Sequence, residues 1–213
     1  MTERAALREQ ILEAALSHVP FDGWTAPALA RGAADLGLGA ADAARAFPGG
    51  AVEALAAFLR RADVAMVEAL ATHDPEAMPV HKRVALAVRL RLEGNAPYRE
   101  AIRRGLSTLA LPQHATLAVK SLYRTVDAIW NAAGDRSTDY NFYTKRMLLA
   151  GVYSTTLLYW LDDESEGHAD TWAFLDRRIR DVGQVPKALD RLRTTADRLP
   201  DPTRLLRPRH ARR

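Results

Sequence analysis

Residues 127–146 read Asp127-Ala-Ile-Trp-Asn-Ala-Ala-Gly-Asp-Arg-Ser-Thr-Asp-Tyr-Asn-Phe-Tyr-Thr-Lys-Arg146, a mixture of aromatic, charged and turn-forming residues in an otherwise Ala-, Leu- and Arg-rich chain. The first eight residues end a helix at Gly134, because glycine readily adopts the left-handed conformation that closes many helices. Ser137 or Asp139 can cap a second helix, since a short polar side chain accepts a hydrogen bond from the free amides of the first turn. The stretch therefore predicts two helices joined by a short turn.

The second of these helices has one unusual face. If it begins near Asp139, four side chains at i, i+3, i+4 and i+7 share one side of it: Asp139, Phe142, Tyr143 and Arg146. An acid, two aromatic rings and a guanidinium suit a docking surface better than a dry core, because aromatic and arginine side chains dominate many protein interfaces. We therefore predict that these four residues form a partner-docking patch.

The rest of the chain also has the composition of helices. Alternating runs of β-branched residues do not occur, and Ala, Leu, Arg and Glu dominate. The predicted fold class is all-α, with about nine or ten helices, at Thr2–Ser17, Thr25–Gly37, Ala40–Ala46, Ala51–Ala71, Val80–Glu93, Tyr98–Ala110, His114–Ala133, Asp139–Leu161, Ala169–Val182 and Val185–Leu199.

Composition argues against most enzyme classes. A chain of 213 residues fits one domain, and the absence of cysteine excludes disulfides, zinc knuckles and thiol nucleophiles. The six histidines are scattered, and no phosphate-binding loop, nucleophile elbow or His-Glu-x-x-His motif occurs. We therefore expect no catalytic residue, no cofactor and no metal site. An enzyme stays an alternative if polar titratable groups converge in a pocket.

Targeting signals are also missing from the sequence. The first residues carry acids and lack a continuous apolar segment, so they resemble neither a secretory signal nor a transit peptide. No run reaches the roughly 18 to 20 apolar residues that a membrane-spanning helix needs. We expect a cytoplasmic protein whose membrane contact is peripheral.

Basic residues are concentrated at the C-terminus. From Asp176 to Arg213 there are 12 basic and 5 acidic residues, a net charge of +7, whereas the other 175 residues hold 18 basic and 21 acidic ones, a net of −3. Apolar residues recur there at helical spacing between the basic ones, and anionic lipids attract such a helix by about 1 kcal/mol per basic residue. The candidate membrane-binding residues are Lys187, Leu189, Arg191, Leu192, Leu199, Leu205 and Leu206. A helix packed on its own domain and a solvated basic tail are the alternatives.

The first 60 residues have the layout of a three-helix DNA-binding head. Ile11–Leu16, Gly23-Trp24-Thr25 with Leu29-Ala30, Gly37-Leu38-Gly39 and Phe47 resemble the helix-turn-helix head of TetR-type repressors. The expected recognition helix, Ala40–Ala46, holds one Asp, one Arg and otherwise alanine. Ala44 and Gly50 stand where those repressors have an aromatic phosphate contact and a lysine.

The charge of this head disfavours DNA. Residues 1–60 hold 5 basic and 7 acidic side chains, a net of −2, so the head cannot gain affinity by neutralising phosphates. We therefore predict a TetR-like fold without DNA binding, and a ligand-responsive transcriptional repressor is the alternative function.

Three further sets of residues carry a closer resemblance, over roughly residues 8–182. Asp127-x-Ile-Trp130, the segment from Ala133 to Arg146, and Asp170-Thr171-Trp172-x-Phe174-Leu175 resemble the accessory protein of ubiquinone (coenzyme Q) biosynthesis of the coenzyme-Q-nine type. Arg91-Leu92-Glu93 with Pro97-Tyr98, and His18-Val19-Pro20 with Gly23-Trp24-Thr25, are similar as well. The high Ala and Arg content and the missing transit peptide indicate a bacterial member.

This resemblance implies a non-catalytic, TetR-like homodimer that binds an isoprenoid quinone lipid at the membrane. It also implies a partner, the hydroxylase that acts on demethoxy-ubiquinone, with Asp139, Phe142 and Tyr143 as the docking surface. The family usually has Trp where Phe142 stands, which reduces the contact area. The implied location is the inner face of the cytoplasmic membrane.

The lipid needs an apolar cavity, and two long helices can supply its walls. Helices His114–Ala133 and Asp139–Leu161 carry six candidate lipid-binding residues, Leu122, Val126, Ile129, Leu148, Val152 and Leu157. Apolar helical stripes usually pack against protein, so a plain core is the alternative. The expected organisation has three parts, namely a degenerate helix-turn-helix-like head (1–60), a lipid-binding and dimerisation domain (61–184) and a basic amphipathic helix with a tail (185–213).

Overall fold

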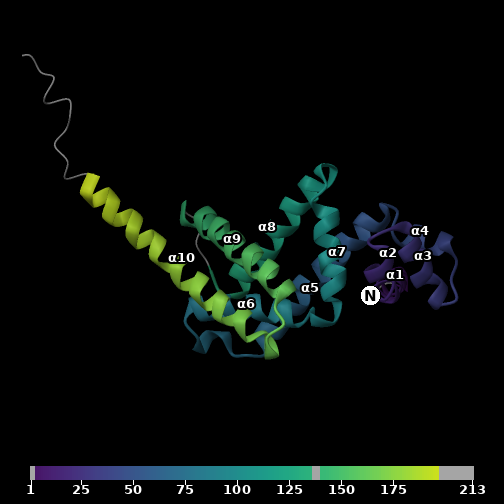
Figure 1. Ribbon diagram of the computed structural model, residues 1–213, viewed down its shortest axis with the longest axis horizontal. Coiled ribbons are helices and arrows are strands. Elements are labelled where there is room, and N and C mark those ends of the chain that lie inside the picture. The colour runs from purple at the N-terminus through teal and green to yellow at the C-terminus, as the bar shows by residue number, and fades with distance from the viewer. Residues whose placement is uncertain (1–2, 136–139, 197–213) are drawn as a thin grey trace, which may run out of the picture.

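The computed structural model describes residues 3–135 and 140–196, and the side chains of residues 4–135 and 142–182. This part of the chain is helical and contains no strand, which confirms the all-α prediction (Figure 1). The α-helices are α1 (Glu3–Ala15), α2 (Val19–Asp22), α3 (Ala26–Asp35), α4 (Ala40–Ala46), α5 (Gly50–Ala71), α6 (Val80–Glu93), α7 (Arg99–Leu109), α8 (Ala115–Ala132), α9 (Tyr140–Asp162) and α10 (Ala169–Ala196). Short 3-10 turns lie at Pro75–Ala77, Ala96–Tyr98, Pro112–His114 and Glu166–His168.

Most predicted helix boundaries are confirmed to within two residues. Thr25 caps α3 as expected, because its hydroxyl oxygen accepts a hydrogen bond of 3.4 Å from the amide of Ala28. The short helix α2 was not predicted. The predicted break between Ala169–Val182 and Val185–Leu199 is wrong, since α10 runs without interruption from Ala169 to Ala196. Proline removes only one helical hydrogen bond, so Pro186 made a boundary probable without enforcing it.

Helices α1 to α4 form the head, which lies at one end of the molecule (Figure 1). Its core holds Ile11, Leu12, Leu29 and Phe47. Helices α1 and α3 cross so closely that a β-carbon on Gly32 would lie 2.5 Å from the backbone nitrogen of Ala15. Glycine is therefore required at this crossing, because any larger residue would push the two helices apart.

Trp24 packs the head against helices α5 and α7 of the rest of the molecule. Its indole nitrogen donates a hydrogen bond of 2.9 Å to the carbonyl of Ala101 in α7. Its ring lies 5.5 Å from the ring of Phe58 in α5, which in turn meets Tyr98 edge-on at 5.9 Å. Buried aromatic pairs of this kind contribute about 0.5–1.5 kcal/mol beyond the area they bury. The head and the body therefore share one continuous core.

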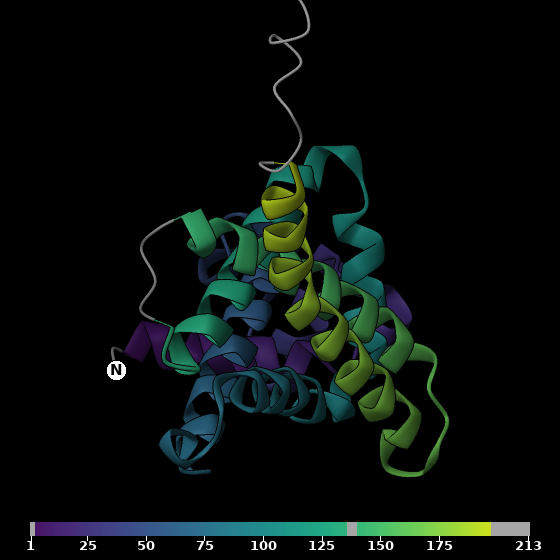
Figure 2. The same ribbon diagram turned by 90° about the vertical axis from the view of Figure 1, so that its left-hand side faces the viewer.

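Helices α5 to α10 form the body, with α8 packed on α5 and α9 (Figure 2). Helix α10 lies across α6 and α9, and its second half extends beyond the body (Figure 1). Its first turns are held by a stacked pair, in which the Phe174 ring lies 4.9 Å from that of Tyr159. Arg89 of α6 covers the ring of Trp172 at 5.0 Å.

A buried carboxylate organises the turn between α9 and α10. Asp163 accepts hydrogen bonds from the amides of Ser165 (2.8 Å) and Thr171 (2.9 Å), and from the Thr171 hydroxyl. Burial alone raises the pKa of a carboxyl group, but these hydrogen bonds to its charged form outweigh burial and hold the pKa of Asp163 well below its usual range. The ionised form of Asp163 therefore stabilises the folded protein.

Replacing Asp163 with asparagine should destabilise the protein at neutral pH by about 1.5–3 kcal/mol, because hydrogen bonds to a charged acceptor are lost. A depressed folded-state pKa gives stability that is present above the unfolded pKa, about 3.9, and is lost as the pH falls toward the folded value. The difference in the free energy of unfolding between wild type and Asp163→Asn, measured by urea unfolding, should therefore become smaller below about pH 4. Asp162→Asn, at an exposed neighbour, is the control. If the difference in unfolding free energy stays constant from neutral to acidic pH, the ionised form of Asp163 does not stabilise the fold.

Candidate functional site

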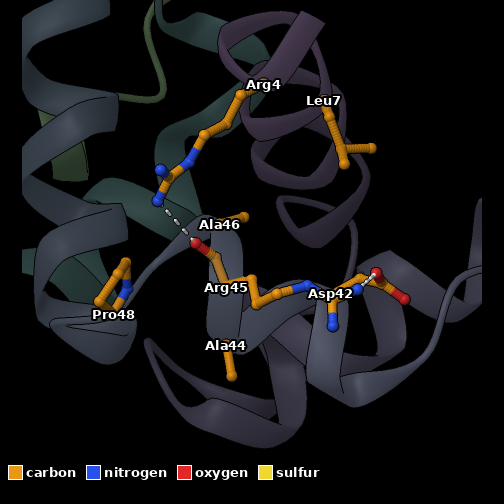
Figure 3. Close-up of a pocket in the computed structure, with 7 residues that line it drawn as sticks. All are labelled: Arg4, Leu7, Asp42, Ala44, Arg45, Ala46 and Pro48. Carbon is orange, nitrogen blue, oxygen red and sulfur yellow. Dashed lines mark hydrogen bonds and ion pairs between the residues drawn. The ribbon is translucent and has the colours of Figure 1, made fainter.

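The described structure contains several hollows, and a first one lies on the head. It has a volume of about 740 Å³ and is lined by Arg4, Leu7, Asp42, Ala44, Arg45, Ala46 and Pro48 (Figure 3). Its charged groups already have partners, because Arg4 donates to the carbonyl of Arg45 at 3.4 Å and Arg45 pairs with Asp42. This hollow is therefore a weak candidate for a binding site.

The outer face of α4 is the surface that a repressor would place in a DNA groove. Ala40, Ala41, Ala44 and Arg45 are exposed there. Arg45 is the only basic residue of this helix, and it is neutralised by Asp42 of the same helix. The exposed face of α4 thus offers methyl groups and a neutralised cation to a phosphate backbone.

The second hollow is a cavity of about 300 Å³ in the body, between α5, α6, α7, α8 and α9. Its walls are largely leucine, from Leu59, Leu106, Leu109, Leu122, Leu157 and Leu158. Leu158 is 57% exposed and therefore stands at the rim, where the cavity meets the surface. A smaller space of about 30 Å³ adjoins the cavity and shares several of these leucines. The arrangement is that of an apolar ligand cavity.

Polar groups gather at one part of the cavity wall, namely Arg91, Ser121, Thr125, Tyr153 and Ser154. Arg91 is held by the buried carboxylate of Asp63 in α5, which accepts a hydrogen bond of 3.0 Å from its Nε. The same carboxylate accepts bonds from Arg124 Nε (3.0 Å) and the Thr125 hydroxyl (2.8 Å). Burial raises the pKa of Tyr153, so its phenol stays a neutral hydrogen-bond donor.

The structure divides the six predicted lipid-binding residues. Leu122 and Leu157 line the cavity, whereas Leu148 is half-buried away from it. Val126, Ile129 and Val152 pack into the main core and do not line the cavity, so the structure favours the alternative of a plain core for these three residues. Helical periodicity marks an apolar face but does not show which apolar residues meet protein and which meet an empty space.

Sequence reasoning missed the contribution of α7 and the polar residues of the cavity. Leu106 and Leu109 come from α7, which was predicted as a helix without a functional role. The resemblance had singled out Arg91, but its burial against Asp63 could not be read from the sequence. The only local signal for the polar wall was the spacing of Ser121 and Thr125 on one face of α8.

The predicted docking patch is split between surface and interior. Tyr143 is 66% exposed, Phe142 is half-buried, and Asp139 lies outside the described residues. Arg146 is only 3% exposed, so its assignment to the surface is wrong. Met147 is 76% exposed one turn after Tyr143, and the i+4 spacing could have revealed it.

Arg146 is buried because it ties α9 to the end of α8. Its Nε donates to Asp127 at 2.8 Å, and its Nη1 lies 3.6 Å from a carboxylate oxygen of Asp135. Its guanidinium also covers the ring of Phe142, with 3.3 Å from the Cζ atom to the ring centre. Asp127, Asp135 and Arg146 therefore serve the fold, and Tyr143 keeps the exposed role.

The candidate membrane-binding residues cannot be placed by their side chains. Lys187, Leu189, Arg191 and Leu192 belong to α10, but their side chains lie outside the described part, as do Leu199, Leu205 and Leu206 altogether. None of the helices described is long and apolar enough to cross a membrane. Within the same residues, no group of three or more His, Cys, Asp or Glu could hold a metal ion.

A helical head joined to a helical body that contains a cavity defines the TetR-like class of proteins. The chain is similar to a crystal structure of the TetR transcriptional regulator from Nitrosomonas europaea, with a TM-score of 0.69 and 21% identity, covering 84% of this chain and 98% of that one. The predicted TetR-like fold is thereby confirmed.

Within this class the sequence identifies a family. Residues 5–34 match the family described as ubiquinone biosynthesis protein COQ9, N-terminal domain, and residues 115–186 match the COQ9 family. The chain is 37% identical over 200 residues to ubiquinone biosynthesis protein COQ9, mitochondrial, of Rattus norvegicus, covering 91% of this chain and 64% of that protein. It is 34% identical over 198 residues to COQ9-B, mitochondrial, of Xenopus laevis, covering 90% of this chain and 67% of that protein. This chain belongs to the COQ9 family.

The family assignment confirms the resemblance given by the sequence motifs. The alignment spans less than two thirds of the length of the rat relative. Residues 115–186 include helices α8 and α9, which form one side of the cavity and carry Tyr143.

Proposed function

We propose that this chain is a non-catalytic accessory protein of ubiquinone biosynthesis that binds an isoprenoid quinone intermediate in the body cavity. The supporting observation is the leucine-walled cavity of about 300 Å³ between α5 and α9. A polyprenyl quinone is almost insoluble in water, and each Å² of apolar surface that it buries contributes about 25 cal/mol to binding. A protein with such a cavity can hold the intermediate for an enzyme that works at the membrane surface.

The size of the cavity determines how much of the ligand it can hold. A volume of about 300 Å³ is at the lower end of the range for small-molecule sites. A long polyprenyl chain exceeds this space, so we expect only one end of the molecule to be enclosed. The exposed Leu158 at the rim gives the remaining chain an apolar exit.

Extraction and native mass spectrometry of the purified full chain test this function. We expect a copurifying hydrophobic ligand that is displaced by added quinone. Protein that never takes up lipid would contradict the proposal.

The partner that we propose is the hydroxylase that acts on demethoxy-ubiquinone, docked at Tyr143 and its neighbours. Two large apolar side chains, Tyr143 and Met147, are exposed on successive turns of α9. Phe142 meets Tyr143 edge-on at 5.1 Å and supports it from the half-buried side. Exposed aromatic side chains with a firm support are typical anchors of protein interfaces.

Tyr143→Ala should weaken binding of the hydroxylase by about 1–3 kcal/mol and leave the fold intact, because this ring is mostly exposed. Calorimetric titration with the purified hydroxylase measures the affinity, and the melting temperature reports the fold. Phe21→Ala, at an exposed ring of α2 in the head, is the matched control. Loss of the fold in Tyr143→Ala would show that the ring is part of the core. Phe142→Ala is a less suitable variant, since it also removes the contact with Arg146.

We also propose a peripheral contact with the inner face of the cytoplasmic membrane through α10. Its second half extends beyond the body, and the sequence there is strongly basic (Figure 1). Cosedimentation with anionic vesicles should decrease as the salt concentration rises, because charge dominates the attraction. The matched COQ9 relatives carry the word mitochondrial in their names.

A homodimer is part of the same proposal. Helix α8 exposes large apolar side chains that a second copy could cover, including Val119 and Tyr123. Light scattering of the full chain tests this assembly.

A ligand-responsive repressor is the second candidate function, because the fold is that of a TetR regulator. The neutralised outer face of α4 argues against it. A gel-shift experiment with genomic DNA fragments at physiological salt distinguishes the two functions. A specific shift that a hydrophobic ligand reverses would favour the repressor.

A further inference from the structure

Ser121 is a buried polar residue that the fold leaves without a partner. It is 4% exposed, it lies on α8, and it lines the body cavity. Its hydroxyl oxygen makes no hydrogen bond with any described residue. Burying a hydroxyl group without a hydrogen bond costs about 1–3 kcal/mol, so a ligand that supplies the missing partner gains affinity.

The surroundings of Ser121 carry an excess of positive charge. Arg91 lines the cavity and is 2% exposed, and Arg124 stands on α8 within one turn of Ser121. Both guanidinium groups share a single carboxylate, that of Asp63. The Nη2 atom of Arg124 is buried and also lacks a partner among the described residues. Two cations and one anion leave a net charge of about +1 beside an otherwise apolar cavity.

Thr125 does not supply the missing partner, because no hydrogen bond joins its hydroxyl group to that of Ser121. Its hydroxyl group donates to Asp63 at 2.8 Å and lies 3.1 Å from the backbone carbonyl of Ser121. Ser121 and Thr125 are one turn apart on the same face of α8, so the cluster of Asp63, Arg91, Ser121, Arg124 and Thr125 is continuous. Arg91, Ser121 and Thr125 line the cavity, and Asp63 is hydrogen-bonded to Arg91, Arg124 and Thr125; we call these five residues the polar end of the cavity.

We propose that the polar end binds the head group of a single-chain amphiphile whose oxygen atoms carry negative charge, such as a carboxylate. The inference rests on the proposed function and narrows its ligand to an intermediate whose head carries an ionised oxygen. The apolar tail lies along the leucine wall and leaves past Leu158, while the Ser121 side chain, whose hydroxyl oxygen is buried, turns toward the head and donates a hydrogen bond to it. A negative head also balances the surplus charge of Arg91 and Arg124, and charge-assisted hydrogen bonds are about twice as strong as neutral ones.

Matched probes with ten-carbon chains, decanoate, 1-decanol and decylammonium, test the inference in calorimetric titrations of the full chain. We expect decanoate to bind about tenfold or more tightly than 1-decanol, and decylammonium to bind most weakly. Geranate and geraniol repeat the comparison with an isoprenoid chain. Tighter binding of geranate than decanoate assigns the ligand to the isoprenoids, and the reverse order assigns it to straight-chain fatty acids.

Variants locate the effect at the polar end. Ser121→Ala should weaken binding of the carboxylate about tenfold and change binding of the alcohol much less. Arg124→Gln should reduce the preference for carboxylate over alcohol, because it removes one positive charge. Ser107→Ala, at an exposed serine of α7 outside the cavity, is the matched control and should bind like wild type. Melting temperatures confirm that each variant is folded.

Two different failures can be told apart. If all probes bind with equal affinity, or if decylammonium binds most tightly, the cavity binds lipids but the predicted preference for a negatively charged head group is wrong. The same holds if Ser121→Ala leaves carboxylate binding unchanged. If none of the probes binds, the lipid-binding function fails and the inference fails with it.

Discussion

Asp63→Ala should lower the free energy of unfolding by about 3–5 kcal/mol, the largest effect that we expect from a single substitution in this protein. The carboxylate of Asp63 joins α5 to α6 through Arg91 and to α8 through Arg124 and Thr125. Its removal leaves the guanidinium of Arg91 buried without a countercharge, and burial of an unpaired charge is far more costly than loss of a surface ion pair. The loss of the countercharge costs less at Arg124, because its side chain is 33% exposed and water can solvate it.

Urea unfolding followed by circular dichroism measures this effect. Glu68→Ala, at an exposed acid on the same helix, is the control and should change stability by less than about 0.5 kcal/mol. The double variant Asp63→Ala with Arg91→Met should recover part of the loss, because it removes the unpaired charge as well. A loss below about 1 kcal/mol in Asp63→Ala would show that water reaches Arg91 and that the polar end is not dry.

Ala118→Trp should nearly abolish lipid uptake, the largest functional effect that we expect. Ala118 lines the cavity from α8, so an indole at this position occupies part of its volume of about 300 Å³. If the ring displaces roughly 100 Å² of ligand contact, the loss is about 2.5 kcal/mol at 25 cal/mol per Å², or about 70-fold in affinity. Titration with the probe that binds wild type most tightly measures the change.

Ala115→Trp is the matched control, because Ala115 is exposed on the same helix. It should bind lipid like wild type. Uptake by Ala118→Trp at the wild-type affinity would mean that the ligand binds elsewhere, and the leucine-walled cavity would lose its assignment. A lowered melting temperature in Ala118→Trp alone would mean that the cavity is too small to accept the ring without strain.

The polar end and the apolar wall have different tasks in this cavity. Leucine side chains contribute affinity in proportion to the apolar area they cover, but they do not distinguish one apolar chain from another. In the inference proposed above, Ser121 and the guanidinium of Arg91 hold the polar head, so that the ligand has one preferred orientation. In the proposed function, orientation determines which end of a quinone intermediate faces the enzyme.

The 127–146 stretch shows what a local pattern can and cannot predict. Gly134, with φ +82, ends α8 as expected, and α9 begins at Tyr140. Phe142 contacts both Tyr143 and Arg146, as helical spacing predicts. Only Tyr143 of these three is mostly exposed. Arg146 is buried in ion pairs with Asp127 and Asp135, and its guanidinium partly covers Phe142.

By itself, the sequence determined the helical content, most helix boundaries, the head and the family, because caps, glycines and helical periodicity act over neighbouring residues. It also placed Leu122 and Leu157 at the cavity. The tertiary structure alone decided that Val126, Ile129 and Val152 are core, that α7 supplies part of the cavity wall, and that Asp63 gathers two arginines beside Ser121. The physical reason is that periodicity fixes which side chains share a helix face, whereas their burial depends on what distant parts of the chain pack against that face.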